Sequence, residues 1–275
     1  MLATHLAAMA ATIVFSRSDS LPQPDGGGAV AASVPEVRVI DYRTEWEGRT
    51  YAWSVMIPPG ATEGGAGLLF LHGYGECGDD GKKNLAVGLP PAVRKNPERW
   101  PMVIIVPQKP VHNSEWEDHE AAVLAILDDA AEKGHYDPEH LAITGLSQGG
   151  HGTIWFAANH ADRFKAAAPV CGYIDRRFDD NNTRMAVRGA TPDSPGTIAT
   201  AEKLKAMPLW LFHGGKDDVV PPGESRSLFA ALGSPKKDDP GALACYTEFP
   251  DANHNSWDAA YGDPELAAWL VRHTR

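Results

Sequence analysis

The chain has 275 residues, of which 43% are hydrophobic and 22% are charged, a composition typical of a globular protein with a large core. Its formal net charge of −11 argues against a nucleic-acid partner, because phosphate groups bind to basic surfaces. The cysteines, Cys77, Cys171 and Cys245, are far apart and form no C-x-x-C pair, so neither a zinc site nor a disulfide framework is predicted.

Residues 1–33 differ in composition from the rest of the chain. Leu6–Phe15 is apolar and has the length of a signal-peptide core, and Ala29–Ala31 resembles a cleavage site. No Lys or Arg precedes the apolar stretch, however, and the gap to the cleavage site is long. We therefore predict a disordered N-terminal extension and a cytoplasmic protein, with a cleaved signal segment and export as the alternative. No later stretch is long and apolar enough to predict a membrane span.

Residues 34–275 are predicted to form a single domain of the α/β class. Residues 36–43 and 50–58 alternate between apolar and polar positions, which is typical of two half-buried strands that pair as a hairpin. Short continuous apolar runs follow, of the kind found in parallel strands that are buried on both faces. These runs are residues 67–73, 102–108, 141–145, 166–172 and 209–215. Helical patterns lie between or after them, at 117–134, 223–233 and 263–273. This order predicts a mainly parallel sheet with helices on both faces.

A serine between glycines follows one of these runs. The motif GLSQG, residues 145–149, lies where the apolar run ends and a helical pattern begins. A strand-to-helix turn this tight forces its central residue into a strained conformation, and glycines on either side make room for it. Because ligands meet the carboxyl ends of the strands in such sheets, we predict that Ser147 is a nucleophile.

A serine hydroxyl needs a base, and in folds of this kind the acid and then the histidine follow the serine along the chain. Asp217 follows the run at 209–215, and His254 lies in a loop after a strand pattern that begins at Tyr246. We predict that His254 takes the proton of Ser147 and that Asp217 orients His254, with Asp218 as the alternative acid.

The other histidines near these motifs have supporting roles in this interpretation. His213 ends a strand and precedes the acid, so we expect it to fix the loop. His151 lies one turn after the serine and is expected to be buried support, and His273 is expected to be solvated in the last helix. The sequence has no H-E-x-x-H motif, and we predict no metal and no cofactor.

A tetrahedral intermediate needs two donors for its oxyanion. We predict the backbone N–H of Gln148, which follows the nucleophile, and that of Tyr74, in the glycine-rich loop after the run at 67–73. Trp116 follows the run at 102–108 and is predicted to line the substrate pocket, with packing as the competing interpretation.

These motifs together resemble the α/β-hydrolase superfamily, and in particular its phospholipase/carboxylesterase and dienelactone-hydrolase-like branch. GLSQGG (145–150) is similar to the serine motif of carboxylesterases and acyl-protein thioesterases, and HGGKDDVVP (213–221) resembles their acid loop, with the acid at Asp217. The blocks at 71–80 and 252–270 look more like a bacterial group of predicted peptidases or esterases. The resemblance covers roughly residues 37–272 and implies an eight-stranded sheet and metal-independent ester hydrolysis. Ser147 departs from the cysteine nucleophile of dienelactone hydrolases.

We therefore predict a serine carboxylic-ester hydrolase that forms an acyl-enzyme and prefers short acyl or aryl esters. A serine peptidase, or an acyl-protein thioesterase or lysophospholipase, is the alternative on the same site. The expected partner is a small-molecule ester, and the sequence leaves the oligomeric state open. The segment Tyr173–Ile198 is predicted to be an irregular flap beside the site. Its arginines, Arg176, Arg177, Arg184 and Arg188, are expected to pair with Asp179 and Asp180 rather than to meet an anionic substrate.

Overall fold

The computed structural model describes residues 36–274 apart from 180, 182, 188 and 236–242. The predicted N-terminal extension or signal segment, residues 1–33, lies outside this range. Within the described part of the chain, no helix is long and apolar enough to cross a membrane.

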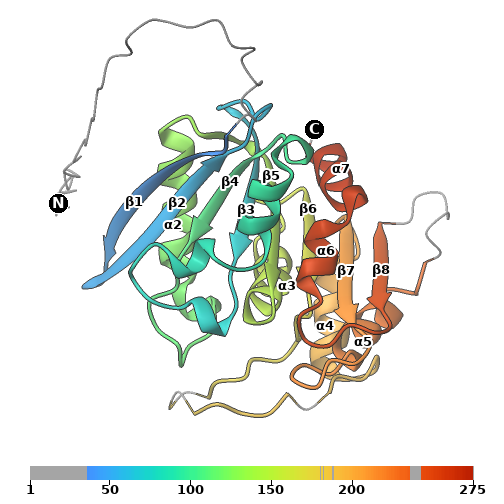
Figure 1. The fold of residues 1–275 in the computed structure, drawn as a ribbon. Coiled ribbons are helices and arrows are strands. Elements are labelled where there is room, and N and C mark those ends of the chain that lie inside the picture. Colours follow the sequence, from blue (N-terminus) through green and yellow to red (C-terminus); the bar gives the residue numbers. More distant parts are fainter. Residues whose placement is uncertain (1–35, 180, 182, 188, 236–242, 275) are drawn as a thin grey trace, which may run out of the picture. The chain divides into compact units, whose positions relative to one another are not determined.

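An eight-stranded sheet forms the centre of the fold, in the order β1-β2-β4-β3-β5-β6-β7-β8 (Figure 1). The strands are β1 (Arg38–Trp46), β2 (Arg49–Ile57), β3 (Gly65–Leu71), β4 (Val103–Pro107), β5 (Tyr136–Leu146), β6 (Ala166–Val170), β7 (Leu209–Gly214) and β8 (Ala244–Phe249). β1 and β2 form the predicted antiparallel hairpin, β2 pairs antiparallel with β4, and every other neighbouring pair is parallel. The predicted mainly parallel sheet is therefore confirmed.

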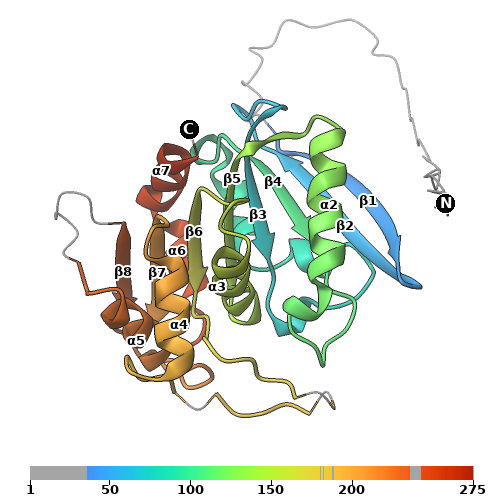
Figure 2. The ribbon, with the colours of Figure 1, turned by 180° about the vertical axis from the view of Figure 1, so that it is seen from behind.

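Helices cover both faces of the sheet, as predicted (Figures 1 and 2). They are α1 (Leu89–Lys95), α2 (Glu120–Glu132), α3 (Gln148–Asn159), α4 (Pro195–Leu204), α5 (Gly223–Ala231), α6 (Trp257–Gly262) and α7 (Pro264–His273). One buried apolar cluster joins the sheet to α2, α3, α4 and α5, and a second joins its other face to α1, α6 and α7. The inner parallel strands β3, β4, β6 and β7 are almost wholly buried, which explains why their sequences are continuous apolar runs, whereas the edge strand β8 is only partly buried.

The segment between β6 and α4 is only partly what the sequence predicted. Residues from Tyr173 onward run without a long helix or strand, but α4 begins at Pro195, inside the stretch that was expected to be irregular. Proline at the first turn of a helix costs no hydrogen bond, and Ser194 precedes it at the N-cap position. The helix was missed because its glycine and threonines are weak helix formers, and its stability comes from packing.

The topology determines where a ligand site forms. From β3 the chain moves to β4 on one side, and it then returns to place β5 on the other side of β3. The strand order therefore reverses between β3 and β5. Crevices at such a switch point, beyond the carboxyl ends of the strands, are the usual ligand sites of α/β sheets. The predicted Tyr74 loop follows β3 and Ser147 follows β5, so both lie at this point.

Candidate active site

Ser147 occupies a strained turn between β5 and α3. Its φ and ψ are 53° and −114°, a region that residues with a side chain rarely adopt. A Cβ atom on Gly149 would lie 1.9 Å from the carbonyl oxygen of Leu71, and one on Gly145 would lie 2.3 Å from the carbonyl oxygen of Gly149. The glycines are therefore needed because the turn packs backbone against backbone, as the motif predicted.

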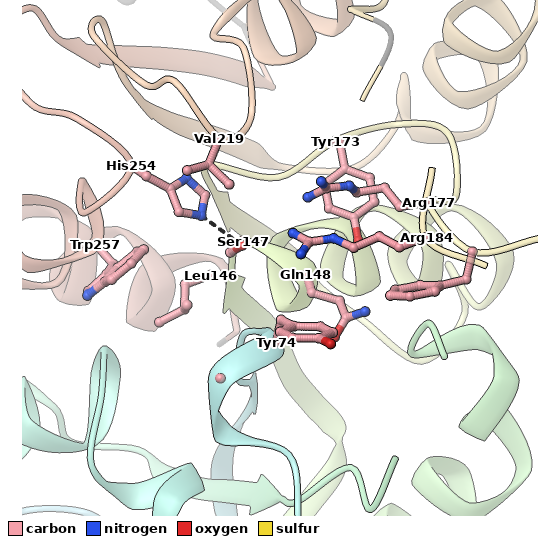
Figure 3. Close-up of a pocket in the computed structure, with 12 residues that line it drawn as sticks. Tyr74, Leu146, Ser147, Gln148, Tyr173, Arg177, Arg184, Val219, His254 and Trp257 are labelled. Atoms are coloured by element: carbon pink, nitrogen blue, oxygen red, sulfur yellow. Dashed lines mark hydrogen bonds between the residues drawn. The ribbon is translucent and has the colours of Figure 1, made fainter. Parts of the chain in front are cut away.

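His254 links this serine to Asp217. Its Nε2 lies 2.9 Å from Ser147 Oγ, and its Nδ1 lies 2.7 Å from Asp217 Oδ2 (Figure 3). An ionised carboxylate only accepts hydrogen bonds, so Nδ1 of His254 donates to Asp217. Nε2 is then free to accept a hydrogen bond from the hydroxyl of Ser147. The ring meets Trp257 edge-on, with the centroids 5.5 Å apart. The structure thus brings together the three residues that the sequence proposed.

Asp217 is held as a buried carboxylate. Its Oδ1 accepts the backbone N–H groups of Val219 and Val220, each at 2.9 Å, while Oδ2 faces His254. Burial acts to raise the pKa of Asp217, but the hydrogen bonds from His213, His254 and Val220 outweigh it and hold that pKa well below the usual range. Asp218, the alternative acid, is exposed, and no hydrogen bond or ion pair joins it to His254.

His213 has the loop-fixing position that its place in the sequence predicted. Its Nε2 lies 3.0 Å from the carbonyl oxygen of Val220, and its Nδ1 lies 2.7 Å from Ser225 Oγ. Since a carbonyl oxygen only accepts, Nε2 is the protonated nitrogen, and Nδ1 accepts from the Ser225 hydroxyl. The buried ring therefore fastens the loop that carries Asp217.

The predicted oxyanion donors lie beside the serine. Gln148 is the first residue of α3, so its N–H has no acceptor within the helix. Tyr74 begins a short 3-10 helix, Tyr74–Glu76, directly after Gly73 at the end of β3. Both residues line the same cavity of ≈ 210 Å³ as Ser147 and His254. Figure 3 shows Tyr74 and Gln148 on the side of Ser147 away from Trp257.

A buried carboxylate that the sequence analysis missed supports this region. Glu115 accepts from the Gln148 side-chain amide at 3.0 Å, from the Tyr173 hydroxyl at 2.8 Å and from the Arg177 N–H at 2.8 Å. These bonds fix the residue that follows the nucleophile. In the sequence, Glu115 is marked only by its position after the buried run at 102–108, directly before Trp116.

Trp116 does not line the cavity, and this corrects the prediction made for it. The side chain is only 1% exposed and belongs to the core cluster on the α2–α5 face. Its indole N–H donates to the carbonyl oxygen of His72, and its Cβ packs against Gly152. The hydrogen bond holds the chain one residue before the Gly73–Tyr74 turn, so Trp116 positions the predicted oxyanion loop from below.

His151 is buried support, as predicted, and it is paired. Its Nδ1 lies 2.9 Å from the Tyr173 carbonyl oxygen, its Nε2 lies 3.1 Å from a Glu117 oxygen, and the ring stacks on Tyr173 at 4.5 Å. Burial acts to lower the pKa of His151, but the hydrogen bond to Glu117 and the charges of Glu117 and Glu115 raise it to about 9. A buried ion pair therefore lies under the flap.

Two groups of potential metal ligands occur among the described residues. Cys171, Asp217 and His254 form one, and Glu115, Glu117 and His151 form the other, with ligand atoms within 4.8 Å of one another. In both groups the carboxylates and imidazoles already hydrogen-bond to one another or to neighbouring side chains. These groups therefore need no cation to balance them, and neither is assigned a metal.

Comparisons with known proteins identify the family of the chain. The sequence model described as the prolyl oligopeptidase family matches residues 113–274, more than half of the chain. Among curated proteins, Esterase LipQ of Mycobacterium tuberculosis is 29% identical over 162 residues, which are 50% of this chain and 37% of LipQ.

Solved structures share the fold over most of the chain. A thermostable esterase has a TM-score of 0.64 and 24% identity, covering 87% of this chain and 64% of the esterase. FphF, a fluorophosphonate-binding serine hydrolase of Staphylococcus aureus, has a TM-score of 0.62 and 17% identity, covering 86% of this chain and 99% of FphF. The fold is thus the α/β-hydrolase fold that the sequence motifs implied. This chain spans only 37% of LipQ and 64% of the thermostable esterase.

Proposed function

Because this chain belongs to the prolyl oligopeptidase family, we propose that it is a serine hydrolase of the carboxylesterase type. The observation that carries the proposal is the continuous hydrogen-bonded line from Asp217 through His254 to Ser147 Oγ. The strained turn at Ser147 supports it, because strain of this kind is found where a side chain must be held for chemistry.

In the proposed mechanism, Ser147 attacks the ester carbonyl as Nε2 of His254 takes its proton. Asp217 stays ionised, because its hydrogen bonds keep its pKa low, and it stabilises the imidazolium that forms. The imidazolium then protonates the departing alcohol, and an acyl-enzyme remains on Ser147 Oγ. Water, deprotonated by His254, hydrolyses the acyl-enzyme and restores the serine. Each step uses only the chain, the ester and water.

The tetrahedral intermediates carry a negative oxygen that needs donors on the far side of the serine from His254. We assign this role to the N–H groups of Gln148 and Tyr74. The positive end of α3 adds to the field at Gln148, and each donor of this kind is worth roughly a hundred- to a thousand-fold in kcat. Glu115 and Trp116 position these donors without touching the substrate.

We further propose that short acyl or aryl esters are the preferred substrates. The cavity of ≈ 210 Å³ is at or below the lower end of typical ligand pockets, which start at about 300 Å³. The apolar residues that line it are mostly aromatic, including Tyr74 and Trp257, and leave little room for a long acyl chain. LipQ is named an esterase, which supports ester rather than amide substrates. The family name favours the second candidate, a serine peptidase on the same site.

A fluorophosphonate probe tests the nucleophile directly. Such probes form a covalent bond with an activated serine, and we expect labelling of the wild-type protein at Ser147. Ser147→Ala should remain folded, lose the label and lose turnover by several orders of magnitude. Labelling at another residue, or substantial esterase activity in folded Ser147→Ala, would remove Ser147 from the mechanism.

Substrate class is then tested by comparing p-nitrophenyl esters with peptide p-nitroanilides. We expect the esters to have the higher kcat/KM, and a chelator to leave their hydrolysis unchanged. Faster turnover of the anilides would favour the peptidase.

A further inference from the structure

Two arginines face the cavity from the side opposite the catalytic histidine. The side chains of Arg177 and Arg184 both reach into the space next to Gln148, while His254 and Trp257 lie across Ser147 from them (Figure 3). Both arginines come from the segment between β6 and α4. An antiparallel bridge between Phe178 and Arg184 folds this segment back on itself, and it thereby brings Arg184 close to Arg177.

Neither arginine is paired with a carboxylate among the described residues. The guanidinium of Arg184 lies 5.0 Å from the centroid of the Tyr74 ring, and that of Arg177 lies 5.4 Å from the centroid of Tyr173. The carboxylate of Asp179, an expected partner, instead accepts the backbone N–H groups of Asn181 and Thr183. The predicted pairing with Asp179 is therefore wrong for these two arginines. The other predicted participants, Asp180 and Arg188, lie outside the described residues, so pairing with Asp180 stays a prediction.

Arg176, in the same segment, provides the contrast. Arg176 is not among the residues that line the catalytic cavity, and its guanidinium pairs with Asp118, with Nη1 3.0 Å from Oδ1. Carboxylates are plentiful in a chain with a formal charge of −11. Arg177 and Arg184 differ from Arg176 because both line the catalytic cavity.

The two positive charges also act on each other. Burial and the positive charge of Arg184 lower the pKa of Arg177, although the nearby Tyr173 and Glu115 act in the opposite direction. The carboxylate of Glu115 lies close by, but it is fully buried and already accepts from Gln148, Tyr173 and the Arg177 N–H. An anion in the cavity would relieve the repulsion. Among the described residues, the guanidinium N–H donors of this pair find a single acceptor, the carbonyl oxygen of Met185, which lies 3.4 Å from Nε of Arg177.

The position of the arginines relative to His254 determines which part of an ester they meet. The departing alcohol must take a proton from Nε2 of His254, so the alcohol lies on the side of His254 and Trp257. The acyl group then extends past Tyr74 and Gln148, toward Arg184 and Arg177 (Figure 3). An anionic group at the far end of the acyl chain would reach the guanidiniums.

We propose that Arg177 and Arg184 bind a carboxylate at the end of the acyl chain, and that the substrates are half-esters of short dicarboxylic acids. The inference rests on the proposed function. Hydrolysis consumes one half-ester and one water. The acyl C–O bond breaks, and the alcohol leaves with the proton that His254 took from Ser147. Water then attacks the acyl carbon while His254 takes one of its protons and returns it to Ser147 Oγ. The new carboxyl group ionises, so each turnover yields the dicarboxylate, the alcohol and one proton.

The test compares charged and neutral acyl groups of the same shape. The ethyl half-esters of succinate, glutarate and adipate are each paired with the ester in which an amide replaces the free carboxylate, and kcat/KM is measured by pH-stat at pH 7.5. For at least one length, we expect the anionic ester to be preferred by about 10- to 100-fold, the range for a charge-assisted hydrogen bond. The preference should shrink with added salt, because salt screens charges.

Arginine variants assign the effect to the pair. Arg184→Gln and Arg177→Gln should each reduce the anionic-to-neutral ratio by about tenfold or more. Arg176→Gln is the matched control, since it removes a guanidinium of the same segment that faces Asp118, and its ratio should equal that of the wild type. Wild-type ratios near or below one at every length would overturn the proposal, and so would equal losses in all three variants.

A binding measurement separates this proposal from the proposed function. Calorimetric titration of the same half-esters into Ser147→Ala requires no turnover. Binding that is lost in Ser147→Ala/Arg184→Gln would support the carboxylate site even if no ester were hydrolysed, and in that case only the proposed function would fail. Hydrolysis of the neutral esters, combined with no binding of any half-ester to Ser147→Ala, would retain the proposed function and overturn the carboxylate site.

Discussion

His213 lies beside Asp217 in the core, with its Nε2 3.3 Å from Oδ2, the same carboxylate oxygen that faces His254. Both side chains are fully buried. The carboxylate is therefore approached by one imidazole from the interior and by another from the active site. This arrangement ties the direction of the Asp217 carboxylate to the core packing of β7.

Asp217→Asn should lower kcat by about a thousand- to ten-thousand-fold, because an amide can donate to His254 Nδ1 and so favour the wrong tautomer of the ring. Asp218→Asn is the matched control, since Asp218 is exposed and the substitution changes the same functional group one residue away. Steady-state kinetics on a short ester measures both. Equal losses would assign the acid to the loop as a whole and not to Asp217.

Gly149→Ala should destabilise the protein by about 3 kcal/mol or more, or prevent folding, because the new Cβ would overlap the carbonyl oxygen of Leu71 at 1.9 Å. Gly223→Ala is the control, as a Cβ there meets nothing within 4 Å. Urea unfolding followed by tryptophan fluorescence gives both free energies. A Gly149→Ala protein as stable as Gly223→Ala would mean that the turn can relax.

The His151–Glu117 pair should make stability fall with rising pH. The folded pKa of His151 is raised to about 9, so between about 6.5 and 9 the folded state binds a proton that the unfolded state has lost. The contribution of the pair is fully present below about pH 6.5 and disappears as pH rises through about 9. Its upper limit is about 3 kcal/mol, at 1.36 kcal/mol for each pKa unit.

The free energy of unfolding, measured from pH 6 to pH 10, tests this dependence. His151→Gln keeps a polar side chain but cannot titrate, so the decline between pH 6.5 and 9 should be smaller in that variant. The same slope in both proteins would show that other groups cause the decline.

A chain-length series of p-nitrophenyl esters should give the highest kcat/KM between about two and six acyl carbons. Each methylene gains about 0.8 kcal/mol only where water is excluded, and a cavity of ≈ 210 Å³ has room for few. Steady-state kinetics across the series checks this range. A maximum at dodecanoate or longer would favour the thioesterase or lysophospholipase alternative.

Local patterns predicted the parts of the site that depend on local backbone. The turn at Ser147 could be identified because its glycines are neighbours of the serine in sequence, although the clash that Gly149 avoids is with the distant carbonyl oxygen of Leu71. Asp217 and His254 could be proposed because parallel strands bring their following loops to one edge of the sheet.

The side chains that the sequence misplaced depend on contacts between distant segments. Trp116 is drawn into the core by Gly152 and by the carbonyl oxygen of His72, and neither lies near it in sequence. Arg184 faces the cavity because its segment folds back at Phe178. No periodic pattern in the sequence predicts this fold-back. Side-chain direction in an irregular segment is determined by such contacts, and composition alone suggested only surface pairing.

Tyr173 contacts both the carboxylate that holds Gln148 and one of the arginines that line the cavity. Its hydroxyl donates to Glu115, which also holds the Gln148 side chain, and its ring lies under the guanidinium of Arg177. A shift of this one ring would disturb both the Arg177 guanidinium and the Glu115 carboxylate that holds the Gln148 side chain. Differences between acyl groups should therefore appear in kcat as well as in substrate affinity. Poor substrates should then bind and yet turn over slowly.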